Sequence, residues 1–85
     1  MNSVTVQVEF MGSISKAVGK DRMQLATSAD LETAIGDVKQ QILAAAPDLL
    51  YTMLIGGMHY SIAIKQGMVL KDGDEIAVIP VTLGG

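Results

Sequence analysis

The sequence predicts an α+β fold in which one long helix packs on a mixed sheet whose first and last strands run parallel at its centre. Three stretches of the chain carry this prediction. Val4 to Phe10 alternates apolar and polar residues, which is typical of a half-buried strand. Thr33 to Ala46 places apolar residues at helical spacing. Ile76 to Val81 is a nearly continuous apolar run, which favours a central strand covered on both faces.

The composition is that of one small globular domain. The chain has 85 residues, of which 49% are hydrophobic and 18% charged, with a formal net charge of -3. This is enough apolar material to fill a single two-layer core. The basic residues are scattered, and the aromatic residues are one Phe and two Tyr. Nucleic-acid binding needs a basic stripe with stacking aromatic side chains, so we expect no nucleic-acid partner. The mildly acidic net charge suits a basic protein partner instead.

Cysteine is absent from the sequence, which excludes a disulfide scaffold, a cysteine-based zinc site and a thiol nucleophile. The first residues lack the basic and apolar regions of a signal peptide. No apolar stretch approaches the roughly 20 residues that a membrane-spanning helix needs. His59 is the single histidine and has no clustered carboxylates near it in sequence, so we expect a packing or surface role. We therefore expect a cytoplasmic protein that binds neither metal nor membrane.

The first half of the chain predicts two strands around a short helical segment. Ile14, Ala17 and Val18 have helical spacing ahead of Gly19, which predicts one or two helical turns closed by that glycine. Arg22 to Thr27 alternates again and predicts a second strand. Because the connection is short, this strand should run antiparallel to the first.

The only long helix is expected at about Thr33 to Ala46, with Asp30 or Thr33 as its N-cap. Gly36 costs this helix about 1 kcal/mol relative to alanine. Pro47 ends it, because proline cannot continue the backbone hydrogen bonds. The stripe expected to face the sheet is Ile35, Val38, Ile42 and Ala45, and the residues expected to face water are Asp37, Lys39, Gln40 and Gln41.

Gly56-Gly57 separates two short apolar runs, and this pattern predicts a hairpin turn that needs positive φ at both glycines. A phosphate-binding loop would need a following helix and a lysine, which are not apparent. Residues 62–69 are expected to be irregular, with a turn at Gly67. A second turn is predicted over Lys71 to Asp74, with Gly73 in the strained position. A ferredoxin-like fold would need a second amphipathic helix, for which residues 62–69 are too short.

The closing stretch of the chain resembles a known family. Residues 70–80, LKDGDEIAVIP, followed by Gly84-Gly85, are similar to the C-terminal signature of the MoaD/ThiS sulfur carriers, closest in pattern to the molybdopterin synthase small subunit. The resemblance extends through the first strand, the long helix and the hairpin. It implies a ubiquitin-like β-grasp fold over residues 1–81, followed by a flexible Gly-Gly tail over residues 82–85. Asp72, Asp74 and Glu75 lack the longer spaced set of ligands that a cation loop needs, so we expect a solvated turn.

In the resembling family the terminal carboxylate is adenylated by an ATP-using enzyme and then converted to a thiocarboxylate. This implies that Gly85 carries the reactive group and that Gly84 lets the chain enter a narrow active site, where a Cβ would clash. The protein would bind no cofactor and would act as a stoichiometric carrier, such as the non-catalytic small subunit of molybdopterin synthase. Its partners would be the ubiquitin-activating-like adenylating enzyme and a sulfur-accepting enzyme such as the synthase large subunit.

The last strand and the tail also contain the expected partner interface. Ile76 and Val78 lie on one face of the strand, and Ala77, Ile79 and Val81 on the other. An apolar face that nothing in the chain covers marks a partner site. We therefore expect partner contacts at Ile79, Val81, Thr82 and Leu83.

Two residues depart from the molybdopterin-type pattern, which often has a second proline at the position of Val81 and a small hydroxyl residue at that of Leu83. Three hypotheses therefore remain open. The first is a sulfur carrier for molybdopterin synthesis. The second is a carrier for thiamine, tRNA thiolation or sulfur amino-acid synthesis. The third is a ubiquitin-like modifier that is joined to target lysines through Gly85.

Overall fold

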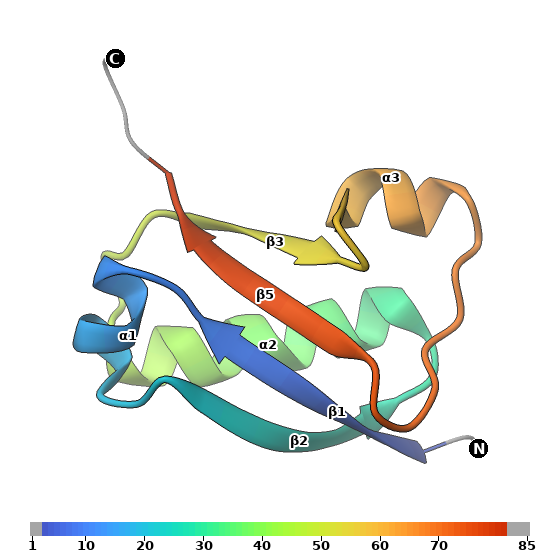
Figure 1. Ribbon diagram of the computed structural model, residues 1–85, viewed down its shortest axis with the longest axis horizontal. Coiled ribbons are helices and arrows are strands. Elements are labelled where there is room, and N and C mark those ends of the chain that lie inside the picture. Colours follow the sequence, from blue (N-terminus) through green and yellow to red (C-terminus); the bar gives the residue numbers. More distant parts are fainter. Residues whose placement is uncertain (1–2, 82–85) are drawn as a thin grey trace.

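The computed structural model describes residues 3–81 (Figure 1). Its first half contains the strand β1 (Ser3–Phe10), the helix α1 (Ser13–Val18), the strand β2 (Arg22–Ser28) and the helix α2 (Leu31–Ala45). Its second half contains the strands β3 (Tyr51–Ile55) and β4 (Met58–His59), the helix α3 (Tyr60–Lys65) and the strand β5 (Glu75–Pro80).

The five strands form one mixed sheet in the order β2-β1-β5-β3-β4. β1 is antiparallel to β2 and parallel to β5, and β3 is antiparallel to both β5 and β4. The predicted parallel pairing of the first and last strands at the centre of the sheet is therefore confirmed. Figure 1 shows how the chain makes this pairing possible, because α2 crosses behind the sheet between β2 and β3.

One layer of buried side chains fills the space between the sheet and α2. The alternation in β1 buries Val6, Val8 and Phe10, as predicted. The buried residues of α2 are Leu31, Ala34, Ile35, Val38 and Ile42. Ala45, which was expected in this stripe, is exposed instead, because the last turn of α2 extends past the core. Ala17 in α1 is exposed as well, so that short helix is anchored in the core by the buried Ile14, with partly buried Val18 packed against it.

Asp30 is the N-cap of α2, and its Oδ2 accepts hydrogen bonds from the backbone N–H of Thr33 at 3.0 Å and from Thr33 Oγ1 at 2.7 Å. The helix therefore begins two residues earlier than predicted. Asp37 was expected to face water, but it is half-buried and accepts a 2.6 Å hydrogen bond from Thr27 Oγ1. This bond fastens the helix to β2 and satisfies a hydroxyl group that would otherwise be buried without a partner.

The prediction that residues 62–69 are irregular was wrong, because Tyr60 to Lys65 forms α3. This helix has only 6 residues, and two of them, Ile62 and Ile64, are β-branched residues of modest helix propensity. A hydrogen bond at its N-cap and its packing on the core compensate for this low propensity. His59 Nδ1 accepts a hydrogen bond from the backbone N–H of Ser61 at 3.2 Å, and buried Ala63 packs the helix on the core. A second long helix, as in a ferredoxin-like fold, is not formed within residues 3–81.

Candidate functional site

The turn before β5 fastens the C-terminal part of the chain to β1. Thr5 donates its backbone N–H to Asp72 Oδ1 at 2.8 Å, and its carbonyl accepts from the backbone N–H of Gly73 at 2.9 Å. Within the turn, Asp74 Oδ2 accepts from the backbone N–H of Lys71 at 2.9 Å. Gly73 has φ 87, the left-handed conformation predicted for it. The carboxylates of Asp72 and Asp74 therefore accept backbone hydrogen bonds that shape the turn and place the start of β5 beside β1.

The two faces of β5 have different environments. Ile76 and Val78 are fully buried under α2, whereas Ala77 and Ile79 are half-buried on the opposite, outer face of the sheet. The predicted assignment of the two faces is confirmed. The prediction that β5 is covered on both faces was wrong, because the described chain places no second layer over the outer face.

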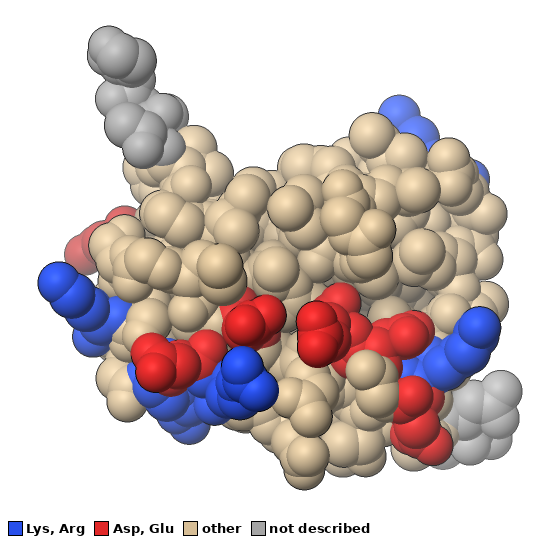
Figure 2. All heavy atoms as spheres, in the orientation of Figure 1, with Lys and Arg blue, Asp and Glu red and all other residues tan. Residues whose placement is uncertain are grey.

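The outer face of the sheet is divided into an apolar half and a charged half. Cross-strand pairs place Leu54 beside Ala77 and Thr52 beside Ile79. We call Thr52, Leu54, Ala77 and Ile79 the apolar patch. Figure 2 looks onto this face, where acidic and basic side chains gather over the β1–β2 side and uncharged residues cover the β5–β3 side. On the charged side, Arg22 Nη2 lies 3.6 Å from Glu9 Oε1.

Three exposed apolar side chains surround the place where the chain leaves β5. Val81 is 41% exposed, and its backbone N–H lies 3.4 Å from the carbonyl oxygen of Leu50, which is 54% exposed. Met11 is 43% exposed and donates its backbone N–H to the carbonyl of Val78 at 2.9 Å. The described chain therefore ends at an apolar rim that adjoins the patch at Ile79. Thr82, Leu83, Gly84 and Gly85 lie outside the described residues.

A shallow groove adjoins the other end of the patch. It has a volume of about 580 Å³ and runs between the Gly56-Gly57 hairpin and the segment before β5. Leu54 and Ala77 of the patch form part of its wall, together with Lys71 and Asp74. Both hairpin glycines have positive φ, as predicted, and β3 pairs with β4 on either side of them. The patch thus continues into a concave, partly charged surface.

His59 has a structural role that agrees with the packing or surface role predicted for it. Its Nδ1 accepts from the backbone N–H of Ser61, so the neutral ring carries its proton on Nε2 and donates it to Thr52 Oγ1 at 2.9 Å. The ring also stacks on Tyr60, with 4.7 Å between ring centroids. This network holds β4 and α3 beside the apolar patch, and sequence patterns alone gave no sign of it.

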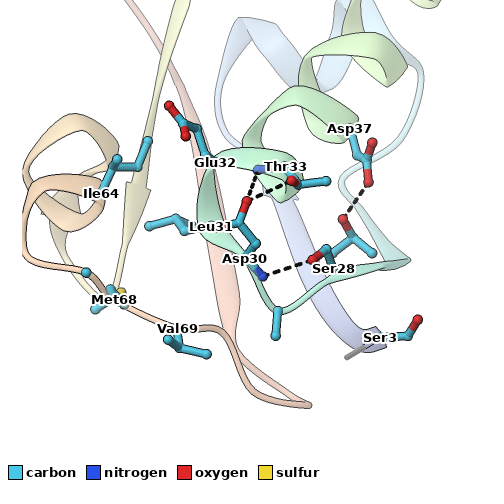
Figure 3. A pocket seen from close by; sticks show the side chains of 13 residues that line it. Ser3, Ser28, Asp30, Leu31, Glu32, Thr33, Asp37, Ile64, Met68 and Val69 are labelled. Atoms are coloured by element: carbon cyan, nitrogen blue, oxygen red, sulfur yellow. Dashed lines mark hydrogen bonds between the residues drawn. The ribbon is translucent and has the colours of Figure 1, made fainter. Parts of the chain in front are cut away.

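A second hollow lies where α2 begins, and it shares Met68 and Val69 with the groove (Figure 3). Its volume is about 770 Å³, and Leu31, Ile64 and Val69 form much of its apolar wall. Figure 3 shows Asp30 hydrogen-bonded to Thr33 and to Ser28. Asp37, which also lines the hollow, accepts a hydrogen bond from Thr27. The hydrogen bonds to Thr33 hold the pKa of Asp30 below its usual value. Ser28, Asp30 and Thr33 form the start of α2, and the bond between Thr27 and Asp37 joins this helix to β2, so the polar groups of the hollow have structural roles.

Residues 3–81 contain no group of three or more His, Asp or Glu side chains placed to hold a metal ion. Among the helices of this part of the chain, none has the length and apolar character needed to cross a membrane.

Several solved structures are similar to this chain in fold. No family model and no curated protein sequence matches the chain. The solution structure of the small archaeal modifier protein 1 from Methanosarcina acetivorans matches with a TM-score of 0.68 and 18% identity, over 100% of both chains. A structure described as molybdopterin converting factor, subunit 1, from Pyrococcus furiosus matches with a TM-score of 0.66 and 19% identity, over 93% of this chain and 99% of the other.

The solution structure of Urm1 from Trypanosoma brucei matches with a TM-score of 0.64 and 21% identity, over 100% of this chain and 99% of the other. The chain has the ubiquitin-like β-grasp fold. The fold implied by the resemblance to the sulfur carriers is thereby confirmed. In this ubiquitin-like β-grasp domain, the apolar patch and the rim at Val81 form the candidate functional surface.

Proposed function

We propose that this protein is a sulfur carrier that works through the carboxylate of Gly85. A carboxylate oxygen attacks the α-phosphate of ATP on a partner enzyme, forming an acyl-adenylate and releasing pyrophosphate. A hydrosulfide equivalent supplied by the partner then attacks the acyl carbon, and AMP leaves. The product is a thiocarboxylate, whose sulfur is passed to a small-molecule precursor on a second enzyme. The protein binds no cofactor itself and remains a stoichiometric carrier in the cytoplasm, with the catalytic residues on its partners.

The observation that carries this proposal is the Gly84-Gly85 pair, which follows the central strand of a ubiquitin-like β-grasp domain within a few residues. Glycine has no Cβ, so this segment fits a narrow active-site channel that excludes other residues. The apolar rim formed by Met11, Leu50 and Val81 adds support, because it surrounds the point where the chain leaves the sheet. A partner that covers this rim would bury apolar surface as it receives the segment that follows.

We assign the partner-binding surface to the apolar patch, to Val81, and to Thr82 and Leu83 beyond it. The first partner is an ATP-dependent adenylating enzyme of the ubiquitin-activating type. The second is a sulfur-accepting enzyme, for which we propose the large subunit of molybdopterin synthase. The fold shared with the Pyrococcus furiosus molybdopterin converting factor subunit supports this pathway. Thiamine synthesis, tRNA thiolation and sulfur amino-acid synthesis are the other pathways that such a carrier would serve.

A protein modifier is the second candidate function. The fold shared with the small archaeal modifier protein 1 favours it. A modifier uses the same adenylate, but the amine of a target lysine attacks the acyl carbon in place of sulfur, and an isopeptide bond results. The two functions therefore differ in the second nucleophile and share the activation of Gly85.

Intact-mass spectrometry separates the two functions. The full chain is incubated with a ubiquitin-activating-like enzyme, ATP and sulfide, and a carrier gains the mass of one oxygen-to-sulfur exchange at Gly85. A chain lacking Gly84-Gly85 is the matched control and should show no exchange. Conjugates on lysine without any sulfur exchange would support the modifier. If the shortened chain gained the same mass, both functions would be refuted.

A pair of variants tests the binding surface separately from the chemistry. Ile79→Arg places a charge in the apolar patch, whereas Gln7→Arg places the same charge on the polar side of the same outer face. Ile79→Arg should lower the rate of adenylation by at least about tenfold when the concentration of this chain limits the reaction. The reason is that a charge buried in a partner interface without a counterion weakens binding. Gln7→Arg should leave the rate within about twofold, since surface substitutions away from an interface have small effects. Equal effects of both variants would exclude the apolar patch as the interface.

A further inference from the structure

The two edges of the sheet differ in how they are protected from pairing with another strand. β4 forms one edge, is only 2 residues long and leads directly into α3. β2 forms the other edge and pairs with β1 at all seven of its positions, from Arg22 to Ser28. It contains no proline, glycine or bulge. Exposed edge strands normally carry such features, because a row of free N–H and carbonyl groups invites another strand to pair.

The free backbone groups of β2 can be assigned from its pairing with β1. The backbone N–H of Phe10 donates to the carbonyl of Asp21 at 2.8 Å, so the backbone groups of Asp21 face β1. Because these groups alternate along an antiparallel strand, those of Arg22, Gln24, Ala26 and Ser28 face away from β1. Within residues 3–81, no backbone group of another element bonds to these four. They form an open row of donors and acceptors at the lower edge of the sheet in Figure 1.

We propose that a second copy of this chain occupies this edge, so that two β2 strands pair antiparallel about a two-fold axis at Leu25. This register places Gln24 of each copy opposite Ala26 of the other, and Arg22 opposite Ser28. Every outward N–H then faces an outward carbonyl of the other copy. In this register, each of the four outward residues of one copy is opposite an outward residue of the other copy. The two five-stranded sheets become one continuous sheet.

Charges and apolar side chains are compatible with this register. Arg22 is the one charged residue of β2, and it lies opposite the uncharged Ser28 of the other copy. No two like charges are opposed along the strand, which would be destabilising. Leu25 faces Leu25, and Met23 faces Thr27, on the side of the sheet that carries α2. Leu25 and Met23 are half-buried in a single chain and would be covered by the second copy.

A groove beside β2 leaves room for the side chains of the second copy. It has a volume of about 230 Å³, and its wall includes Val18, Met23, Gln41 and Ala45. The apolar patch lies over the other side of the sheet, on β5 and β3. Pairing through β2 therefore leaves the patch and the end of β5 free in both copies. The proposal does not depend on the carrier function, and each can fail without the other.

Sedimentation velocity of the full chain over a concentration series tests the pairing. The wild-type chain should shift from monomer to dimer as its concentration rises. Ala26→Pro removes one outward N–H from each copy and leaves the ladder to β1 intact, so association should weaken at least about tenfold. Ala26→Val keeps the N–H and should still dimerise. A wild-type chain that stays monomeric at every concentration, or an Ala26→Pro chain that associates as well as wild type, overturns the proposal.

Amide hydrogen exchange measured by NMR gives a residue-specific readout. The amides of Gln24 and Ala26 should exchange fast in dilute protein and slowly in concentrated protein. The amide of Leu25 faces β1 and should be protected at both concentrations, which confirms that β2 stays folded. Protection of Gln24 and Ala26 that appears only when another protein is added would assign the edge to a foreign strand and refute self-pairing.

Discussion

Two glycines of this domain should respond in opposite ways to the same substitution. Gly36 lies inside α2 at a helical φ, and a Cβ added there meets no atom within 4 Å. Gly73 lies in the turn before β5 at φ 87, and a Cβ added there also meets no atom within 4 Å. Since steric contact is absent at both sites, the backbone conformation alone decides the sign of the effect.

Gly36→Ala should stabilise the protein by about 1 kcal/mol, because alanine is the better helix former and restricts the unfolded chain. For a domain of this size, that change raises the Tm by about 4 to 8 °C. Gly73→Ala should destabilise it by about 1 to 2 kcal/mol, the cost of placing a side chain in the left-handed region. The turn at Gly73 also holds two hydrogen bonds to Thr5, which strain would weaken further.

Urea denaturation followed by circular dichroism measures both variants under the same conditions. The two midpoints should move in opposite directions with unchanged slopes, since neither substitution alters the surface exposed on unfolding. A Gly36→Ala variant that is no more stable than wild type would contradict the helical position of this residue. An equally stable Gly73→Ala variant would contradict the positive φ and the turn built on it.

Three further predictions concern the strand faces and the titrating groups. Val78→Ala should cost about 2 to 3 kcal/mol in urea denaturation because it empties fully buried space, whereas Ile79→Ala on the half-buried outer face should cost about 1 kcal/mol. Hydrogen bonds from Thr33 lower the pKa of Asp30 in the folded state. The stability that this carboxylate contributes is therefore present above its unfolded pKa of about 3.8 and is lost as the pH falls through the lower folded value. Asp30→Ala should flatten this part of a curve of stability against pH. Burial, and secondarily the charge of Tyr60, raises the pKa of Tyr51 above its ordinary value of 10.0. Ultraviolet titration should therefore show one tyrosine that ionises at higher pH than a free tyrosine. The stability of the fold should fall as the pH rises above 10.0.

The sequence predicts most of the elements that depend on periodicity. The alternation in β1, the helical stripe of α2 and the glycine hairpin each occur where the pattern indicates. Each of these elements has enough repeats for its period to be distinguished. α3 was missed because its apolar residues Ile62, Ala63 and Ile64 are consecutive and show no helical spacing, unlike those of the equally short α1. Its helical state depends on the His59 cap and on the packing of Ala63, which are tertiary contacts.

The outer face of β5 shows a second limit of sequence patterns. An apolar run predicts that both faces of a strand avoid water, but it does not say which molecule covers them. Ile76 and Val78 are covered by this chain, whereas Ala77 and Ile79 are half-buried and lie on an open face. The same hydrophobic pattern therefore encodes both a core and a surface that we assign to a partner. The hydrogen bond between Thr27 and Asp37 was missed for a related reason, because a polar residue on a helix is expected to face water.

The hydrogen bond from Thr5 to Asp72 joins residues that are 67 positions apart in the chain. β5 is the last of the five described strands along the chain, yet it fills the gap between β1 and β3 at the middle of the sheet. A growing chain on the ribosome cannot complete the core until β5 has emerged, and contacts of such long range make the final step of folding slow. A nascent or truncated chain without β5 exposes two strand edges and is an easy substrate for proteases. Completion of the core of this domain therefore depends on the placement of β5 between β1 and β3.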